Sequence, residues 1–322
     1  MKKGMRIALI IFALVVCVVI YTCWDNQRII VQTQEVFIDS LPDAFDGYTI
    51  LQISDLHGKY FGEKQEKLLS TIASVPHDII LFTGDMNLGT ESDEASSQAI
   101  FDLLDGLQGE RMLWVDGNCG PYTVENFIWP TGRLTEIGET VTSKGVEILT
   151  EPIEIEKDGA SIYFTGKLAW SHLKDDYECL DLSNKDADLR EAIEAYHAKQ
   201  VAWYEKLNHE ELTLIAVDHY PEQSYLADET WEYEQHLPYD LMICGHNHGG
   251  QICLPFIGAV YIPTVSSSRG GYFPNQQDVR GLQTIAQTQQ YISAGLGASG
   301  NALVRFRFLC PPEINQIILR KK

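Results

Sequence analysis

The chain has 322 residues, 45% of them hydrophobic, and a formal net charge of −21 at pH 7. This length and apolar content are enough for a sizeable buried core, and no repeat, low-complexity stretch or long linker divides the chain. A surface with so many more acidic than basic side chains repels the phosphate backbone, which argues against nucleic acid as a substrate or partner.

The first thirty residues have the composition of a membrane-spanning segment. Lys2, Lys3 and Arg6 precede an uncharged apolar run at residues 7–24. As a helix with a rise of about 1.5 Å per residue, this run nearly crosses a hydrocarbon core of roughly 30 Å. Because basic residues favour the cytoplasmic side, we expect residues 1–30 to be a single-pass signal anchor in the cell membrane, with a cytoplasmic N-terminus.

A cleaved signal peptide is the alternative interpretation of this segment. The apolar run exceeds the usual length of roughly 7 to 15 residues, and no A-x-A-like cleavage site follows it. Lipid attachment at Cys23 is weaker still, because Thr22 is not the small residue that normally precedes such a cysteine. In the anchored interpretation, residues 35–322 form one extracytoplasmic domain.

The rest of the chain alternates strand-like and helix-like patterns in its first half and is rich in strands in its middle and end. Strands are predicted at residues 35–38, 48–54, 79–83, 112–115, 145–149, 153–156, 161–165, 212–217, 241–244, 291–293, 304–308 and 313–319. Helices are predicted at residues 63–75, 93–107, 186–206 and, with a poorer pattern, 223–234, and a loop at 266–287. The mixture predicts an α/β fold in which helices flank two packed mixed sheets.

Five of the strand-like runs end abruptly at Asp, His or Asn. They are I-S-D-L-H (53–57), L-F-T-G-D (81–85), V-D-G-N (115–118), V-D-H-Y-P (217–221) and I-C-G-H-N-H (243–248). Their oxygen and imidazole donors are Asp55, His57, Asp85, Asn118, His219, His246 and His248. Divalent transition metals accept such donors, and open α/β sheets place ligand sites at the carboxyl ends of strands. We therefore expect the five motifs to converge on a site for two metal ions.

Local spacing supports this interpretation. Side chains two residues apart in a strand share a face, so Asp55 should point the same way as His57, and His246 the same way as His248. Three of the donors follow a glycine that is expected to allow a tight turn, namely Gly84, Gly117 and Gly245. Any one of these donors alone could be an ordinary core, surface or turn residue, so the prediction depends on their joint appearance.

The motifs and their order resemble the calcineurin-like metallophosphoesterase family, whose signature reads D-x-H, G-D, G-N-H-(D/E), H and G-H-x-H. The resemblance covers residues 35–319, and the flanking sequences G-G-Q (249–251) and C-P-P (310–312) are similar to the membrane-associated or secreted bacterial branch. It implies a four-layer α/β/β/α sandwich of two mixed sheets. It also implies two divalent cations, Mn, Fe, Zn or Co, and a metal-activated water that attacks phosphorus.

By the same resemblance, each cation has its own set of ligands, and one carboxylate is shared. One ion would be held by Asp55, His57, Asp85 and His248. The other would be held by Asp85, Asn118, His219 and His246. Asp85 would therefore bridge the two ions.

One position departs from the family pattern, because Cys119 follows Asn118 where the signature has His. In the family, that His is proposed to stabilise charge on the phosphoryl oxygens or to protonate the leaving group. A thiol is a poorer donor and, at an ordinary pKa of about 8.5, is partly ionised near neutral pH. Cys119 is thus a degenerate general-acid position, read as an inert replacement, a weak proton donor or an extra thiolate ligand. His172 is a further candidate to cap the pocket or to replace the missing acid.

We therefore expect a membrane-anchored, dinuclear-metal phosphohydrolase that cleaves a phosphodiester or pyrophosphate bond, in a small molecule or a lipid-linked substrate. Loss of the usual proton donor favours substrates with a good leaving group over monoesters. The alternative is a catalytically weakened, metal-stabilised protein that binds a phosphorylated ligand or a protein partner. Patterns of the phosphate-cradling, serine-hydrolase and zincin classes (G-x-x-x-x-G-K-(S/T), G-x-S-x-G and H-E-x-x-H) are absent from the sequence.

Overall fold

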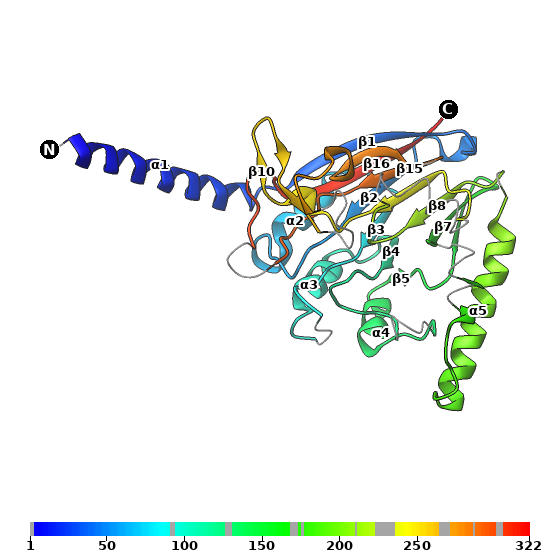
Figure 1. The fold of residues 1–322 in the computed structure, drawn as a ribbon. Coiled ribbons are helices and arrows are strands. Elements are labelled where there is room, and N and C mark those ends of the chain that lie inside the picture. Colours follow the sequence, from blue (N-terminus) through cyan, green and yellow to red (C-terminus); the bar gives the residue numbers. More distant parts are fainter. Residues whose placement is uncertain are drawn as a thin grey trace.

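In the computed structural model, two six-stranded mixed sheets pack face to face, with helices on both outer faces (Figure 1). The structure describes residues 3–90, 94–125, 131–167, 173–174, 177–209, 211–222, 236–263, 271–285, 287–300 and 305–322. The expected four-layer α/β/β/α sandwich is confirmed.

The first sheet has the strand order β1-β16-β2-β3-β4-β5. Its strands are β1 (Ile30–Ile38), β16 (Glu313–Lys321), β2 (Thr49–Ile53), β3 (Ile79–Thr83), β4 (Met112–Val115) and β5 (Val146–Ile148). β2, β3 and β4 run parallel, so their carboxyl ends lie at one edge. Its outer face is covered by α2 (Glu66–Ala73), α3 (Gln98–Gly106) and α4 (Glu136–Ser143).

The second sheet has the order β14-β15-β9-β8-β7-β6. Its strands are β14 (Gly281–Ile285), β15 (Thr288–Ile292), β9 (Leu241–Cys244), β8 (Leu214–Val217), β7 (Ala160–Gly166) and β6 (Ile153–Lys157). β15, β9, β8 and β7 run parallel, and β14 and β6 are antiparallel to their neighbours. α5 (Ala187–Leu207) packs on the outer face.

Alternation of side chains along the strands builds the apolar layers between these elements. In β3, Leu81 packs into the core between the sheets, whereas Phe82 packs toward the helices on the outer face. In β8, Ile215 enters the core between the sheets and Leu214 the layer under α5. Each such fully buried side chain contributes about 1.5–3 kcal/mol relative to an exposed one. The strands are therefore held from both sides, and their ends are fixed in position.

Most predicted elements are confirmed, with differences at their ends. β3, β4 and β9 have the expected bounds. β1 begins earlier than predicted, because it pairs with β16 from Ile30 onward. α3 begins later, at Gln98. The predicted helix at 223–234 lies outside the described residues.

One helix was missed, and two expectations for the chain were wrong. The helix α4 was missed, since its sequence is polar and its start is marked mainly by the cap at Thr135, whose side chain accepts from the Gly138 N–H. The segment 266–287, expected to be a loop, contains the strand β14 and part of a short hairpin. In the described part of the predicted strand at 304–308, Phe308 forms only an isolated bridge with Ile252.

The remaining elements are short. The hairpins are formed by β10 (Cys253–Leu254) with β11 (Gly258–Ala259) and by β12 (Tyr261–Ile262) with β13 (Gly271–Tyr272). The 3-10 helices are η1 (Asp43–Phe45), η2 (Glu63–Gln65), η4 (His248–Gly250) and η5 (Gln276–Asp278). Apart from η2, which forms the start of the helix predicted at residues 63–75, none of these short elements was predicted.

The helix α1 (Lys3–Asp25) projects away from the sandwich (Figure 1). Its large apolar side chains are exposed, and it is long and apolar enough to cross a membrane. At its end, the side chain of Asp25 is buried and forms an ion pair with Arg28 at 2.7 Å. α1 is therefore a candidate membrane span, and an N-terminal signal sequence would meet the same criteria of length and hydropathy.

Candidate metal centre

The carboxyl ends of β2, β3, β4, β8 and β9 meet at one edge of the sandwich, where hydrogen bonds join the segments that follow the strands. The Asp55 N–H donates to the carbonyl of Gly84 at 3.0 Å. The imidazole of His219, from the second sheet, donates from Nδ1 to the carbonyl of Thr83, in the first sheet, at 2.8 Å. The His246 N–H donates to the carboxylate of Asp55 at 3.2 Å. The two sheets thus share one polar site.

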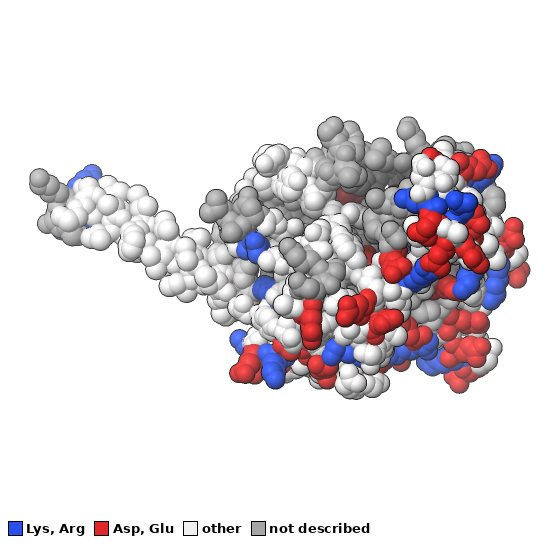
Figure 2. All heavy atoms as spheres, turned by 90° about the horizontal axis from the view of Figure 1, so that it is seen from below, with Lys and Arg blue, Asp and Glu red and all other residues white. Residues whose placement is uncertain are grey.

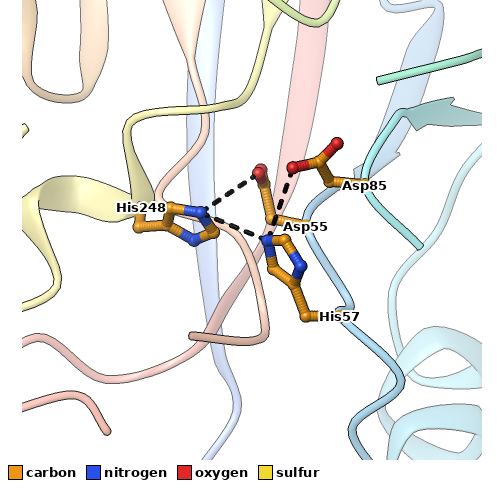
Figure 3. A group of neighbouring side chains, drawn as sticks. All are labelled: Asp55, His57, Asp85 and His248. Carbon is orange, nitrogen blue, oxygen red and sulfur yellow. Dashed lines mark hydrogen bonds and ion pairs between the residues drawn. The ribbon is translucent and has the colours of Figure 1, made fainter. Parts of the chain in front are cut away.

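Four side chains form the first group of this site: Asp55, His57, Asp85 and His248 (Figure 3). All four are buried, and their ligand atoms lie within 4.8 Å of one another. Nε2 of His57 lies 3.3 Å from Nε2 of His248 and 3.5 Å from Oδ2 of Asp85. Nε2 of His248 lies 3.7 Å from Oδ1 of Asp55. These are the four residues that the family resemblance assigns to one ion.

The second group contains Asp85, His219 and His246, and Asn118 adjoins it. Nε2 of His219 lies 3.4 Å from Oδ1 of Asp85 and 3.1 Å from both Oδ1 of Asn118 and Nδ1 of His246. Asp85 therefore faces the first group with Oδ2 and the second with Oδ1. The structure brings together all seven residues that the sequence motifs supplied.

The spacing and orientation of these atoms fit divalent cations. Ligand bonds of about 2.0–2.2 Å place neighbouring ligand atoms around a cation about 3.0–3.5 Å apart, close to the separations found here. His57 can donate its Nδ1–H to the carbonyl of Asn87 at 3.1 Å, as His219 does to Thr83, so that each Nε2 keeps its lone pair for a metal. The site is thus built to receive positive charge.

Electrostatics of the buried groups point to the same conclusion. Burial raises the pKa of Asp55. Burial acts to lower the pKa of His219, but the hydrogen bond to Asp85 and the charges of both carboxylates raise it to about 9. Burial lowers the pKa of His246 to about 4 and that of His248 well below its ordinary value. His246 and His248 are therefore neutral and able to act as ligands near neutral pH.

The backbone at the site differs from the expected strand geometry. The strands end at Ile53, Thr83 and Cys244, before the donors. Beyond these ends, five donors have a left-handed backbone: Asp55 (φ 52°), His57 (φ 49°), Asp85 (φ 59°), His246 (φ 69°) and His248 (φ 51°). Each such conformation costs roughly 1–3 kcal/mol in a residue other than glycine. The donors converge, but the argument from alternation within a strand was wrong.

The motif glycines serve two different purposes. Gly84 has a φ of +86° and turns the chain as expected. Gly117 and Gly245 do not have a left-handed backbone, and they instead leave space for the donors. A Cβ at Gly117 would lie 2.2 Å from Oδ1 of Asp85, and one at Gly245 would lie 2.6 Å from Oδ2 of Asp55. A methyl group at either position would displace a carboxylate of the site.

Cys119 lies beside the second group without belonging to it. Its main-chain N–H donates to Oδ1 of Asp85 at 2.6 Å, and its Sγ accepts a weak hydrogen bond from the amide of Asn118 at 3.5 Å. Burial and the charge of Asp85 raise the pKa of the thiol to about 12. Without metal, the thiol is therefore protonated at neutral pH, contrary to the expected partial ionisation. His172 lies outside the described residues.

Two residues near the site were missed in the sequence. Tyr220 follows His219 directly, and its partly exposed ring lies 4.6 Å from the ring of His246. Arg307 is fully buried and donates to the carbonyl of His248 at 2.8 Å. No spacing pattern distinguishes Tyr220 from the other tyrosines. The apolar neighbours of Arg307 suggested a strand at residues 304–308, not a buried arginine beside the site.

A cavity of about 420 Å³ adjoins the first group. Its lining includes Asn247 and His248 at the site and the apolar residues Ile252, Val260, Tyr261, Pro263 and Tyr272. The lining also includes the polar residues Gln251 and Ser299, so the cavity combines a largely apolar wall with a few polar groups.

Comparisons with known proteins agree with the geometry. A model of the calcineurin-like phosphoesterase family matches residues 48–250. The uncharacterized metallophosphoesterase YkuE of Bacillus subtilis is 28% identical over 306 residues, which cover 93% of this chain and 89% of YkuE.

Two further relatives match over about a quarter of their length. The phosphodiesterase YaeI of Escherichia coli is 32% identical over 82 residues, 26% of each chain. The UDP-2,3-diacylglucosamine pyrophosphatase LpxG of Chlamydia muridarum is 34% identical over 88 residues, 27% of this chain and 25% of LpxG.

Proposed function

The chain belongs to the calcineurin-like phosphoesterase family, and on this premise we propose that it is a membrane-anchored, dinuclear-metal phosphohydrolase acting on phosphodiester or pyrophosphate bonds. The position of Asp85 carries the proposal. Its two carboxylate oxygens face two separate groups of buried donors, at 3.5 Å from His57 and 3.4 Å from His219. A carboxylate in that position can hold two cations at once.

In this proposal the seven donors hold two divalent ions, one in each group. When bound, the pair supplies Lewis acidity toward a phosphoryl oxygen and activation of water at neutral pH. The chain's own residues orient the donors. His57 and His219 are each fixed through Nδ1 by a main-chain carbonyl, and the Cys119 N–H holds Oδ1 of Asp85. Preorganised donors of this kind keep the site's geometry without reorganisation during the reaction.

The preference for diesters and pyrophosphates follows from Cys119. A thiol is a poorer proton donor than the imidazole of the family signature, so it gives little help to a departing alkoxide. A phosphodiester or pyrophosphate bond whose leaving group is a stable anion needs less protonation of that group during cleavage. The relatives support this assignment by their names, since YaeI is a phosphodiesterase and LpxG a pyrophosphatase.

We also propose the location and a substrate class. α1 would anchor the protein with Lys3 and Arg6 on the cytoplasmic side and the domain outside the membrane. An anchored enzyme meets substrates in or near the bilayer, and the cavity beside His248 has a largely apolar lining. LpxG is named for a substrate that carries acyl groups. A lipid-linked phosphoester is consistent with all three observations.

The second candidate function is a metal-stabilised protein that binds a phosphorylated ligand without turning it over. The observation that favours it is again Cys119, which stands where the family signature has the proton-donating His. Both functions require the metal centre, so metal content alone does not separate them. Activity does.

The test uses the full chain in detergent with added Mn²⁺. We expect it to hydrolyse bis(p-nitrophenyl) phosphate faster than an alkyl phosphomonoester, and Asp85→Asn to abolish the activity, while Asp39→Asn, a change at an exposed position, leaves it unchanged. Cys119→His should raise turnover of substrates with poor leaving groups by about 10²-fold, the usual contribution of one general acid. An inert wild type combined with an active Cys119→His variant would instead establish the binding function.

A further inference from the structure

One part of the domain surface is apolar although the chain is strongly acidic. Residues 249–263 contain no charged side chain. Together with β13 and the residue that follows it, Phe273, they expose six large apolar side chains, here called the hairpin surface: Leu254 (37%), Phe256 (109%), Ile257 (50%), Tyr261 (45%), Tyr272 (77%) and Phe273 (66%). The rings of Tyr261 and Tyr272 lie 5.2 Å apart, across the β12–β13 pair. An exposed cluster of this kind marks an interaction surface.

Two of these exposed rings belong to residues with an unusual backbone conformation. Phe256 has a φ of 67° and Phe273 a φ of 53°, a left-handed conformation that bulky residues rarely adopt. The Phe273 N–H donates to the carbonyl of Val260 at 2.7 Å, which joins the second hairpin to the segment between β11 and β12. Because Val260 directly follows β11, this hydrogen bond links the second hairpin to the first, and the two hairpins together carry the six exposed side chains.

Main-chain contacts place the hairpin surface beside the end of α1. The side chain of Asn26 donates to the carbonyl of Arg307 at 2.6 Å and accepts from its N–H at 2.9 Å. The next residue, Phe308, donates to the carbonyl of Gln251 and accepts from the N–H of Cys253, both at 2.9 Å. Figure 1 shows β10 close to the point where α1 leaves the domain.

The end of α1 also has the side chains of a membrane interface. Tyr21 and Trp24 are exposed, and the guanidinium of Arg28 lies 5.1 Å from the ring centre of Trp24. Aromatic and basic residues in this arrangement are typical of the headgroup layer. On the face seen in Figure 2, most Asp and Glu side chains lie on the part of the domain away from α1, where they would not approach anionic lipids.

We propose that the hairpin surface docks into the boundary between headgroups and acyl chains of the same bilayer that α1 crosses. The inference rests on the proposed membrane anchor, and it makes lipid the partner of this surface. Tyr261 and Tyr272 belong both to the hairpin surface and to the lining of the cavity beside His248. Docking would therefore set the cavity at the lipid surface, so that the phosphate of a membrane lipid reaches the donors while its acyl chains remain in apolar surroundings.

The experiment uses the full chain in nanodiscs of phosphatidylcholine and phosphatidylglycerol, with p-benzoylphenylalanine replacing Phe256. After irradiation, intact mass spectrometry counts lipid adducts. The matched control carries the same label at Phe37, which is 51% exposed and lies near the end of β1 farthest from α1. We expect adducts at Phe256 at about tenfold or more above those at Phe37. Equal yields at the two positions, or cross-links from Phe256 to a second copy of the chain, overturn the inference.

A label at Phe273 provides a second position should the first disturb the hairpin, and it is expected to give the same enrichment. Each labelled protein is also assayed with bis(p-nitrophenyl) phosphate, which is soluble and needs no docking. Hydrolysis without lipid adducts at Phe256 and Phe273 refutes the docking surface and leaves the enzyme standing. Lipid adducts without hydrolysis refute the proposed enzyme and leave the docking surface standing.

Discussion

Arg307 donates a hydrogen bond from Nη2 to the main-chain carbonyl of His248, at 2.8 Å. The same guanidinium donates to the carbonyls of Ala294, Gly297 and Cys310 at 2.6–2.7 Å. Because the main chain of Arg307 also bonds to Asn26, a single residue connects the end of α1 with a residue of the metal centre. A link of this kind fixes the candidate metal centre relative to α1.

Replacement of Arg307 should therefore destabilise the domain. Lysine has neither the planar shape nor the number of donors to serve four carbonyls, so Arg307→Lys leaves buried acceptors unpaired. We expect it to lower the free energy of unfolding by about 3 kcal/mol, measured by denaturant titration. Arg305→Lys, two residues away and exposed, is the control and should be nearly neutral. Equal stability of the two variants would show that the buried hydrogen bonds contribute little.

The thiol of Cys119 should be unusually unreactive in protein stripped of metal. Burial and the charge of Asp85 raise its pKa to about 12, so at pH 8 only about one thiol in 10⁴ is ionised. We expect iodoacetamide to modify Cys119 about 100-fold more slowly than the exposed Cys179, as followed by peptide mass spectrometry. Rapid modification of Cys119 would indicate a thiolate and would revive its interpretation as a metal ligand.

The stability of the metal-depleted protein should depend on pH through His219. Its pKa rises from 6.5 to about 9 on folding, mainly through Asp85, so the stabilisation is fully present below pH 6.5 and is lost as the pH rises through 9. The difference corresponds to at most about 3 kcal/mol. The midpoint temperature of thermal unfolding, measured by circular dichroism between pH 6 and 10, should decrease as the pH rises through 9. This decrease in midpoint temperature should be absent in His219→Gln. A decrease of equal size in the variant would show that groups other than His219 cause the pH dependence.

The positions of the seven candidate donors could be predicted from the sequence because each follows a buried strand. Strand runs such as residues 79–83 are fixed by their apolar pattern, and parallel strands bring their carboxyl ends to one edge. The residue that follows a strand is then placed within a few ångströms whatever its own conformation. This is why the seven donors converge as expected although the local argument for Asp55 and His57 was wrong.

What could not be read from the sequence depends on tertiary contacts. The left-handed backbone at Asp55 is stabilised by hydrogen bonds with segments that are distant in sequence. The Asp55 N–H donates to the carbonyl of Gly84, and the His246 N–H donates to the carboxylate of Asp55. The burial of Arg307 likewise depends on carbonyl groups from several loops. No local sequence pattern indicates that these carbonyls lie together. The hairpins between residues 253 and 272 were missed because their strands are only two residues long, too short for a period to be seen.

The space that Gly117 provides for Asp85 leads to the last prediction. A Cβ at position 117 would lie 2.2 Å from Oδ1 of Asp85, so Gly117→Ala must displace the carboxylate that faces both groups. We expect the variant to fold but to bind fewer than two metal ions per chain, measured by elemental analysis after dialysis against Mn²⁺, and to lose about 10²-fold or more in hydrolysis of bis(p-nitrophenyl) phosphate, because a displacement near 1 Å disrupts catalysis to that extent. Gly166→Ala is the matched control, since its nearest neighbour is the carbonyl of Leu149 at 3.9 Å and its backbone suits alanine. Full metal binding by Gly117→Ala would show that Asp85 can move without loss, and would remove the shared carboxylate as the basis of the dinuclear site.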